Sequence, residues 1–117
     1  MIVLEIRQSE LGDRHPDTAR SMNNLAYLYS SIGQHNQALP LFELALEIWK
    51  SELGDRHPST ASSLNNLALL YKSMGQYDRA LPLLEQTLSI RQEVLPAGHP
   101  NTLSTQQSLE VLRGWMN

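Results

Sequence analysis

The fold is decided by residues 57–90, HPSTASSLNNLALLYKSMGQYDRALPLLEQTLSI, because much of the remaining chain repeats this stretch at a fixed offset. Two short motifs mark the copies, which stand 42 positions apart: His-Pro at 15–16, 57–58 and 99–100, and Asn-Asn-Leu-Ala at 23–26 and 65–68. A fixed period of this length is typical of a repeat array, in which each unit packs on its neighbours. We therefore expect an all-α array of about six helices and no single globular core.

Composition narrows the classes of function. The chain has 117 residues, 41% of them hydrophobic, which is enough for a packed interior. Its formal charge is −3, and its sequence contains no stripe of basic residues that could bind phosphates, so we expect no nucleic-acid partner. It contains no cysteine, which excludes disulfides and thiolate zinc sites. No apolar run approaches the roughly 20 residues that span a bilayer, so we expect no membrane contact and a cytoplasmic location.

The repeat divides the chain into four parts. Residues 1–11 align with the second helix of a unit, residues 16–53 and 58–95 form two full units, and residues 100–114 form a last helix. In each full unit a first helix, which we call helix A, ends at a glycine and is followed by helix B. In the first unit we expect helix A from about Pro16 to Ile32 and helix B from about Asn36 to Ser51.

Apolar side chains recur at three and four positions along these helices, which predicts one buried face for each. In the first unit these residues are Met22, Leu25, Ala26, Leu28, Tyr29 and Ile32, then Ala38, Leu41, Phe42, Ala45, Leu46 and Ile48. In the second unit they are Leu64, Leu67, Ala68, Leu70, Tyr71 and Met74, then Ala80, Leu84, Leu88 and Ile90. Pro40 and Pro82 fall about a turn inside helix B, where we expect a modest cost.

The two ends of the array differ. The last helix carries Glu110 and Arg113 where the second unit has Ala68 and Tyr71, and an unpaired charge is costly to bury, so we expect a capping helix. The apolar residues of the first segment, in contrast, have no preceding helix to cover them: Val3, Leu4 and Ile6. We expect this edge to be hidden by pairing into a homodimer or by a preceding repeat.

The unit resembles the tetratricopeptide repeat, because Leu67, Ala68 and Tyr71 on helix A and Ala80 on helix B match that pattern. The longer form, with L-G-x-x-H-P at 11–16 and 53–58 followed by N-N-L-A-x-L-Y at 23–29 and 65–71, resembles the repeats of kinesin light chain and of bacterial proteins with similar arrays. The resemblance implies a bacterial source and a right-handed superhelical solenoid whose A helices line a concave groove. Thr87 departs from it, since a small alanine is commoner there.

One stripe of each A helix remains outside the predicted helix–helix contacts, spaced three, four and three. By resemblance, the asparagines of this stripe hold the backbone of an extended partner peptide, since an amide offers both a donor and an acceptor. The asparagines could equally hydrogen-bond between adjacent helices and hold the stack in register. The predicted groove residues are Arg20, Asn23, Asn24, Tyr27, Ser30, Ser62, Asn65, Asn66, Leu69, Lys72 and Gln107, with Ser104 and Val111 at the remaining stripe positions of the last helix.

No pattern indicates catalysis. The repeated histidines sit a unit apart, on the order of 10 Å, whereas zinc ligands converge to about 2 Å from one ion. A histidine before proline is better suited to capping a helix. We therefore expect no metal, no cofactor and no enzymatic activity. The sequence predicts a protein–protein interaction scaffold, with a structural spacer or oligomerisation module within a larger protein as the alternative.

Overall fold

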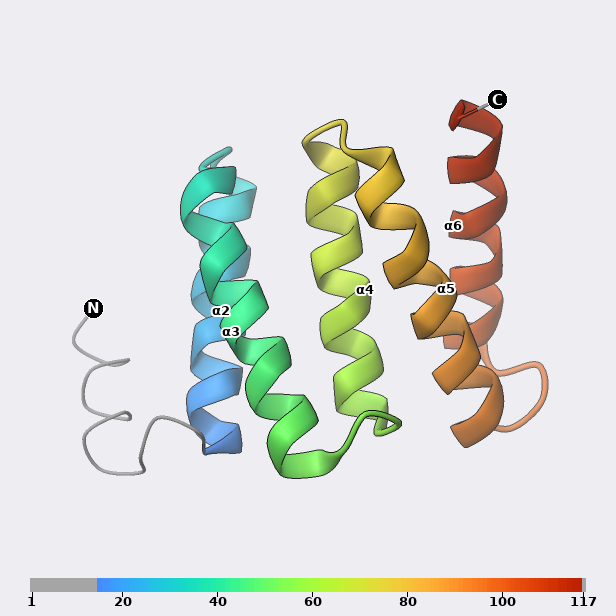
Figure 1. The fold of residues 1–117 in the computed structure, drawn as a ribbon, viewed down its shortest axis with the longest axis horizontal. Helices are drawn as coiled ribbons and strands as arrows, with labels where there is room; N and C mark the ends of the chain where they lie inside the picture. Colours follow the sequence, from blue (N-terminus) through green and yellow to red (C-terminus); the bar gives the residue numbers. More distant parts are fainter. Residues whose placement is uncertain (1–14, 117) are drawn as a thin grey trace. The chain divides into compact units, whose positions relative to one another are not determined.

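The computed structural model describes residues 15–116, which form five α-helices. These are α2 (Pro16–Ser31), α3 (His35–Leu53), α4 (Pro58–Ser73), α5 (Tyr77–Val94) and α6 (Pro100–Met116) (Figure 1). The described residues contain no strand, and the prediction of an all-α chain is confirmed. The sixth helix, expected over residues 1–11 with its exposed Val3, Leu4 and Ile6, lies outside the described residues. The chain divides into two compact units, with the boundary between Asp55 and Arg56.

Histidine caps the start of every helix A. The Nδ1 atoms of His15, His57 and His99 each accept a hydrogen bond of 3.0 Å from the backbone N–H two residues later. The proline that follows each histidine occupies the first helical position, where its missing N–H costs no hydrogen bond. The predicted capping role is confirmed, and this role leaves Nδ1 unavailable to a metal.

The hairpin turns owe their shape to glycine. Gly33 and Gly75 have φ of 81° and 77°, a left-handed conformation that glycine adopts without steric cost. In the first unit Gln34 N–H donates to the Tyr29 carbonyl oxygen at 2.8 Å, and Gly33 N–H donates to that of Ser30 at 3.1 Å. These two bonds form a Schellman motif, which satisfies carbonyls left open at the helix end. The same bonds recur in the second unit.

The first unit is the hairpin of α2 and α3. Its core joins Ala19 and Met22 of α2 to Ala45 and Ile48 of α3, with Leu41 and Trp49 packed against them. Trp49 is therefore a packing residue. Phe42, also buried, lies edge-on to Tyr27 of α2, with ring centroids 5.6 Å apart.

The predicted burial of Leu28 of α2, and of Ile32 directly after this helix, is wrong. Leu28 and Ile32 are 64% and 66% exposed, although Leu70, the equivalent of Leu28 in the second unit, is only 2% exposed. Their spacing is helical and apolar, as predicted, but α3 covers a different face of α2. The first unit thus presents these two large aliphatic side chains to solvent, besides the less exposed Leu44 and Leu53 of α3.

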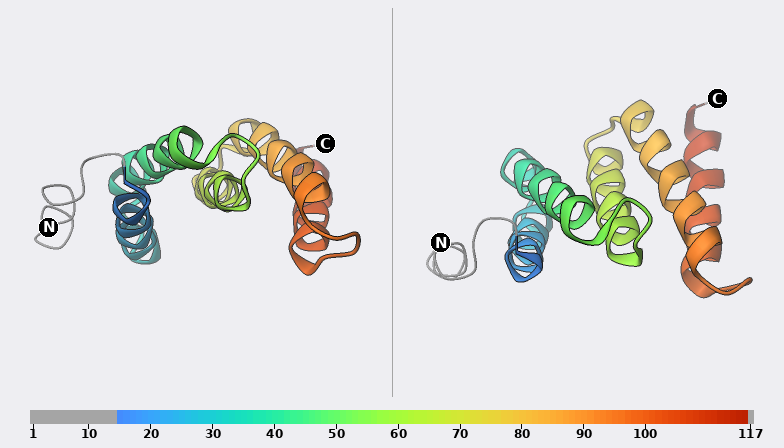
Figure 2. Two further views of the ribbon diagram at one scale, coloured as in Figure 1. Left: turned by 90° about the horizontal axis from the view of Figure 1, so that it is seen from below. Right: turned by 60° about the horizontal axis from the view of Figure 1, so that its bottom comes forward.

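The second unit contains α4, α5 and α6, with α5 between the other two (Figures 1 and 2). On α4 the predicted face from Leu64 to Tyr71 is buried, and Ala68 is fully enclosed. From α5, Ala80, Leu84 and Ile90 complete this interior. Each fully buried leucine or isoleucine contributes about 1.5 to 3 kcal/mol relative to an exposed one.

The last helix packs on α5 through a mixed interface. Leu109 and Leu112 are buried beside Thr102 and Thr105, whereas Glu110 and Arg113 are exposed. That α6 caps the array stays a prediction. Arg113 pairs with Glu85 of α5 at 3.1 Å.

The guanidinium of Arg91 also lies at this interface. The residue is 9% exposed, and one of its nitrogens donates to the Thr105 hydroxyl at 2.8 Å and to the Asn101 carbonyl at 3.3 Å. Burial lowers the pKa of Arg91 below its usual value because it desolvates the charged form.

Pro40 and Pro82 are each the sixth residue of their helix. The amides without a helical partner are only the first four, so each proline does remove one hydrogen bond, contrary to the expected reason for a modest cost. The carbonyls that lose their donor belong to Asn36 and Asp78. Both of these residues and both prolines are exposed, so water can replace the missing donor.

Candidate functional site

The predicted stripe on α4 lies on the side of the helix that α5 leaves open. Ser62 and Leu69 are exposed, and Asn65 and Lys72 are half-buried. The residues between them, Leu64, Leu67, Ala68 and Tyr71, are buried. The stripe therefore combines a hydroxyl, an amide, an aliphatic side chain and an ammonium group, all reachable from solvent.

The equivalent stripe on α2 is also accessible. Arg20 and Tyr27 are exposed, and Asn23 and Ser30 are half-buried. Arg20 donates to the carboxylate of Asp17 at 3.3 Å, an exposed ion pair one turn earlier. The Tyr27 ring is exposed on the stripe and also packs against Phe42. Asp17 thus offsets part of the charge of Arg20.

The two asparagines of each pair do not share one environment. Asn24 is exposed and Asn23 half-buried, whereas Asn65 and Asn66 are both half-buried. Asn23 and Asn66 each make further contacts. The assignment of these four asparagines to the groove stays a prediction.

Aromatic and cationic side chains meet at the far end of the α4 stripe. The Nζ atom of Lys72 lies 5.0 Å from the ring centroid of Trp115, near the end of α6. The ring of Tyr77, the first residue of α5, lies 5.5 Å from that of Trp115. Arg79 lies over the Tyr71 ring at 5.8 Å. Gln107 of α6, the last predicted stripe residue, is exposed.

Sequence reasoning missed the contact between Lys72 and Trp115. Trp115 stands outside the repeat pattern, and its equivalent one repeat earlier, at the end of α4, is Ser73. A periodic pattern carries no information about a residue that occurs in one copy. The one available signal was the tryptophan itself, since an aromatic ring near a helix end is often packed.

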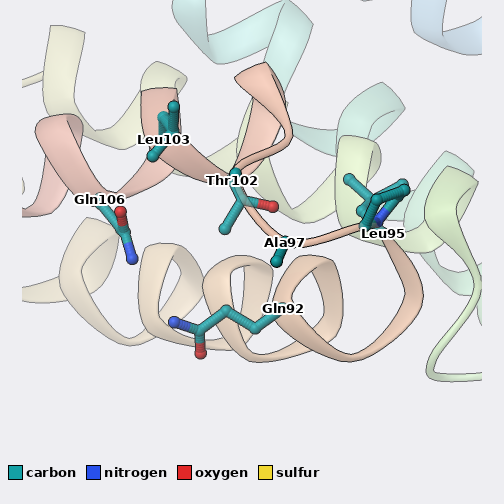
Figure 3. A pocket seen from close by; sticks show the side chains of 8 residues that line it. Gln92, Leu95, Ala97, Thr102, Leu103 and Gln106 are labelled. Atoms are coloured by element: carbon teal, nitrogen blue, oxygen red, sulfur yellow. The ribbon is translucent and has the colours of Figure 1, made fainter.

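A hollow lies where α5 passes into α6 (Figure 3). Its volume is about 300 Å³, and its lining carries no charged side chain: Gln92, Leu95, Pro96, Ala97, Gly98, Thr102, Leu103 and Gln106. The amides of Gln92 and Gln106 point toward one another from the two helices (Figure 3). The hydroxyl oxygen of Thr102 is buried without a hydrogen-bond partner. One repeat earlier, on α4, the equivalents of Leu103 and Gln106 are Ala61 and Leu64, which are buried.

Residues 15–116 contain no group of three or more His, Asp or Glu side chains placed to hold a metal ion. None of the helices in this described part of the chain is both long and apolar enough to cross a membrane.

Comparison with known proteins agrees with this architecture. The tetratricopeptide repeat family matches residues 2–50 and 23–93. No curated protein is significantly similar to the chain. Two crystal structures, one of them of a substituted variant, show the nearly identical TPR-like repeats of a protein described as a kinesin light chain of Podosopora anserina. The variant is 34% identical over 94% of this chain and 52% of its own, with a TM-score of 0.86.

The other Podosopora anserina structure is 35% identical over 86% of this chain and 48% of its own, with a TM-score of 0.75. BtubC (BKLC) from P. vanneervenii shares the fold, with a TM-score of 0.79 and 22% identity over 99% of this chain and 54% of its own. The chain spans about half the length of these proteins. The family match and the helical hairpins together show that this chain belongs to the tetratricopeptide repeat family, with units of the kinesin-light-chain-like type.

Proposed function

We propose that the chain is a protein-interaction scaffold that binds an extended peptide or a partner segment in a concave groove lined by its A helices. The proposal rests on family membership, because helical repeat arrays generally offer extended concave surfaces to partner proteins. The residues proposed to make the contact are the stripes of α2, α4 and α6, with Asn23, Asn65 and Gln107 as their amide members.

The single observation that carries the proposal is the accessibility of the α4 stripe. A half-buried amide such as that of Asn65 is held in place by its surroundings, yet it can still exchange hydrogen bonds with a partner. Leu69, exposed one turn later, would supply apolar contact area. A partner that lies along this stripe would meet hydrogen-bonding groups first and aliphatic and aromatic groups further on.

Binding to a randomised peptide library displayed on phage tests the proposal. We expect recovered peptides to bind the parent chain and to lose about 5- to 150-fold in affinity to the variant Asn23→Ala, Asn65→Ala, because two peptide-backbone hydrogen bonds are removed at roughly 0.5 to 1.5 kcal/mol each. Asn36→Ala is the matched control, since Asn36 is an exposed asparagine of α3 outside the stripe. Equal binding by the double variant would show that the groove assignment is wrong.

The second candidate is an oligomerisation or spacer module, favoured by the exposed Leu28 of α2 and the exposed Ile32 directly after that helix. Such a pair of aliphatic side chains on one helix face is a candidate contact for another helix. Light scattering over a concentration series distinguishes the candidates. A dimer that is lost in the variant Leu28→Lys, Ile32→Lys would support pairing through this edge, and a monomer at every concentration would contradict it.

A further inference from the structure

The end of α6 covers one of the two cations of the proposed groove. Lys72 is half-buried on α4, and its ammonium lies 5.0 Å from the centroid of the Trp115 ring. Among residues 15–116, no carboxylate forms an ion pair with Lys72. The face of an aromatic ring attracts a cation, and this attraction grows as water is excluded. Trp115 therefore covers one side of the Lys72 ammonium group.

Tyr77 holds Trp115 in this position. The two rings are 5.5 Å apart and inclined at 55°, an arrangement within the favourable range for aromatic pairs. Tyr77 begins α5, so the indole is fixed by residues of two other helices while 53% of its own surface stays exposed. The contact thus joins all three helices of the second unit through exposed or half-buried side chains, which can separate without opening the core.

We infer that Trp115 is a built-in occupant of the Lys72 end of the groove, and that a partner gains access to Lys72 only by displacing it. The inference rests on the proposed function for its second half, the competition with a partner. When a partner displaces Trp115, the contact between Trp115 and Lys72 is lost, and the free energy of this contact is subtracted from that of binding. The indole therefore lowers the affinity for partners and favours those that make equivalent contacts with Lys72.

The size of the effect follows from the strength of the contact. An exposed cation–π pair lowers the population of the open form about two- to fivefold. Removing the ring should raise the accessibility of Lys72, and the affinity for a groove-bound partner, by the same factor, because an open site that is only partly populated weakens apparent binding in proportion.

Lysine acetylation tests the first half without a partner. The chain has two lysines, Lys50 and Lys72, and Lys50 is exposed, so the ratio of their acetylation rates, measured by mass spectrometry, is internally controlled. We expect Trp115→Ala to raise the ratio of Lys72 to Lys50 about two- to fivefold. Trp115→Leu, which keeps bulk and removes the ring face, should raise it nearly as much. Met116→Ala, the exposed neighbour on the same turn, should leave the ratio unchanged. An unchanged ratio in Trp115→Ala would overturn the inference.

Affinity for a library-selected peptide tests the second half. The probe is a peptide that binds the parent chain and binds the variant Asn23→Ala, Asn65→Ala more weakly. We expect Trp115→Ala to bind it about two- to fivefold more tightly, with Met116→Ala unchanged. Equal binding would show that Trp115 does not compete with the partner, and weaker binding would show that it contributes contacts instead. If no such peptide exists, the proposed groove is wrong, and so is the proposed competition between Trp115 and a partner. The acetylation experiment still decides whether Trp115 covers Lys72.

Discussion

One position of the repeat is buried on α4 and exposed on α6, and the two copies should respond differently to substitution. Ala68 of α4 is fully enclosed, whereas its equivalent Glu110 of α6 is exposed. We expect Ala68→Glu to unfold or severely destabilise the second unit and Glu110→Ala to change stability by no more than about 0.5 kcal/mol.

The magnitude for Ala68→Glu follows from the protonation of a buried carboxyl group. A glutamate without a partner in this interior is most cheaply buried as the neutral acid, and protonating a group of ordinary pKa near 4.3 at pH 7 costs about 3.7 kcal/mol at 1.36 kcal/mol per unit. Overpacking adds about 1 to 3 kcal/mol. The total approaches the whole stability of many small domains, about 5 to 15 kcal/mol.

The same reasoning predicts the pH dependence. Burial raises the pKa of the new carboxyl group, so the folded state binds more protons than the unfolded state between the two pKa values and stability falls as pH rises. At pH 5 the protonation cost is only about 1 kcal/mol. Ala68→Gln is the matched control, because it brings similar bulk without a charge and should show no such dependence.

Urea unfolding measures these effects. In a Trp49→Phe background the remaining tryptophan, Trp115, reports on the second unit, and circular dichroism reports on the whole chain. The reasoning is refuted if Ala68→Glu loses less than about 1 kcal/mol at pH 7, or if its deficit relative to Ala68→Gln does not shrink at pH 5.

The remaining predictions concern single side chains, each checked by urea unfolding. His57→Ala should lower the free energy of unfolding by about 1 kcal/mol, because the helix cap is lost. His57→Asp should keep most of the stability that the cap provides, since aspartate caps well. Equal losses in the two variants would contradict the capping role. Leu84→Ala should cost about 2 to 5 kcal/mol because it opens a cavity at a fully buried site, and a loss below that range would mean that the site collapses. Arg91→Met should change stability by less than about 1 kcal/mol, since burying the charge is costly and the Thr105 hydroxyl still donates to a backbone carbonyl; a larger loss would show that the guanidinium is essential to the interface. Ser63→Ala should stabilise by up to about 1 kcal/mol, because the serine hydroxyl is buried without a hydrogen-bond partner, and a loss would reveal a hidden one.

Features set by neighbouring residues could be predicted from the sequence. A histidine before proline caps a helix by accepting a hydrogen bond from the backbone N–H two residues later, and a glycine at the end of a helix adopts a left-handed conformation. Both features follow from local chemistry. The helix faces were also largely correct, because the apolar residues recur with the period of a helix. These two kinds of signal account for the five helices and for most of the core of the second unit.

Features set by a distant neighbour could not be predicted. Leu28 is as apolar as Leu70 and stands at the same position of the repeat, so the sequence pattern does not distinguish the exposed side chain from the buried one. Arg91 is buried although arginine is usually exposed, because the α6 backbone and a threonine supply its hydrogen bonds. The contact between Trp115 and Lys72 depends on the reach of one side chain across the second unit.

Each described helix pairs with one that lies next to it along the chain: α2 with α3, α4 with α5, and α5 with α6. Such short-range pairing requires little loop-closure entropy, and domains are generally able to fold during synthesis, beginning at the N-terminus. The α2–α3 hairpin can therefore form its own core while α4 to α6 are still being translated. A damaging substitution in the later helices would leave a nascent chain with one structured hairpin and an unstructured remainder, a species open to chaperones and proteases.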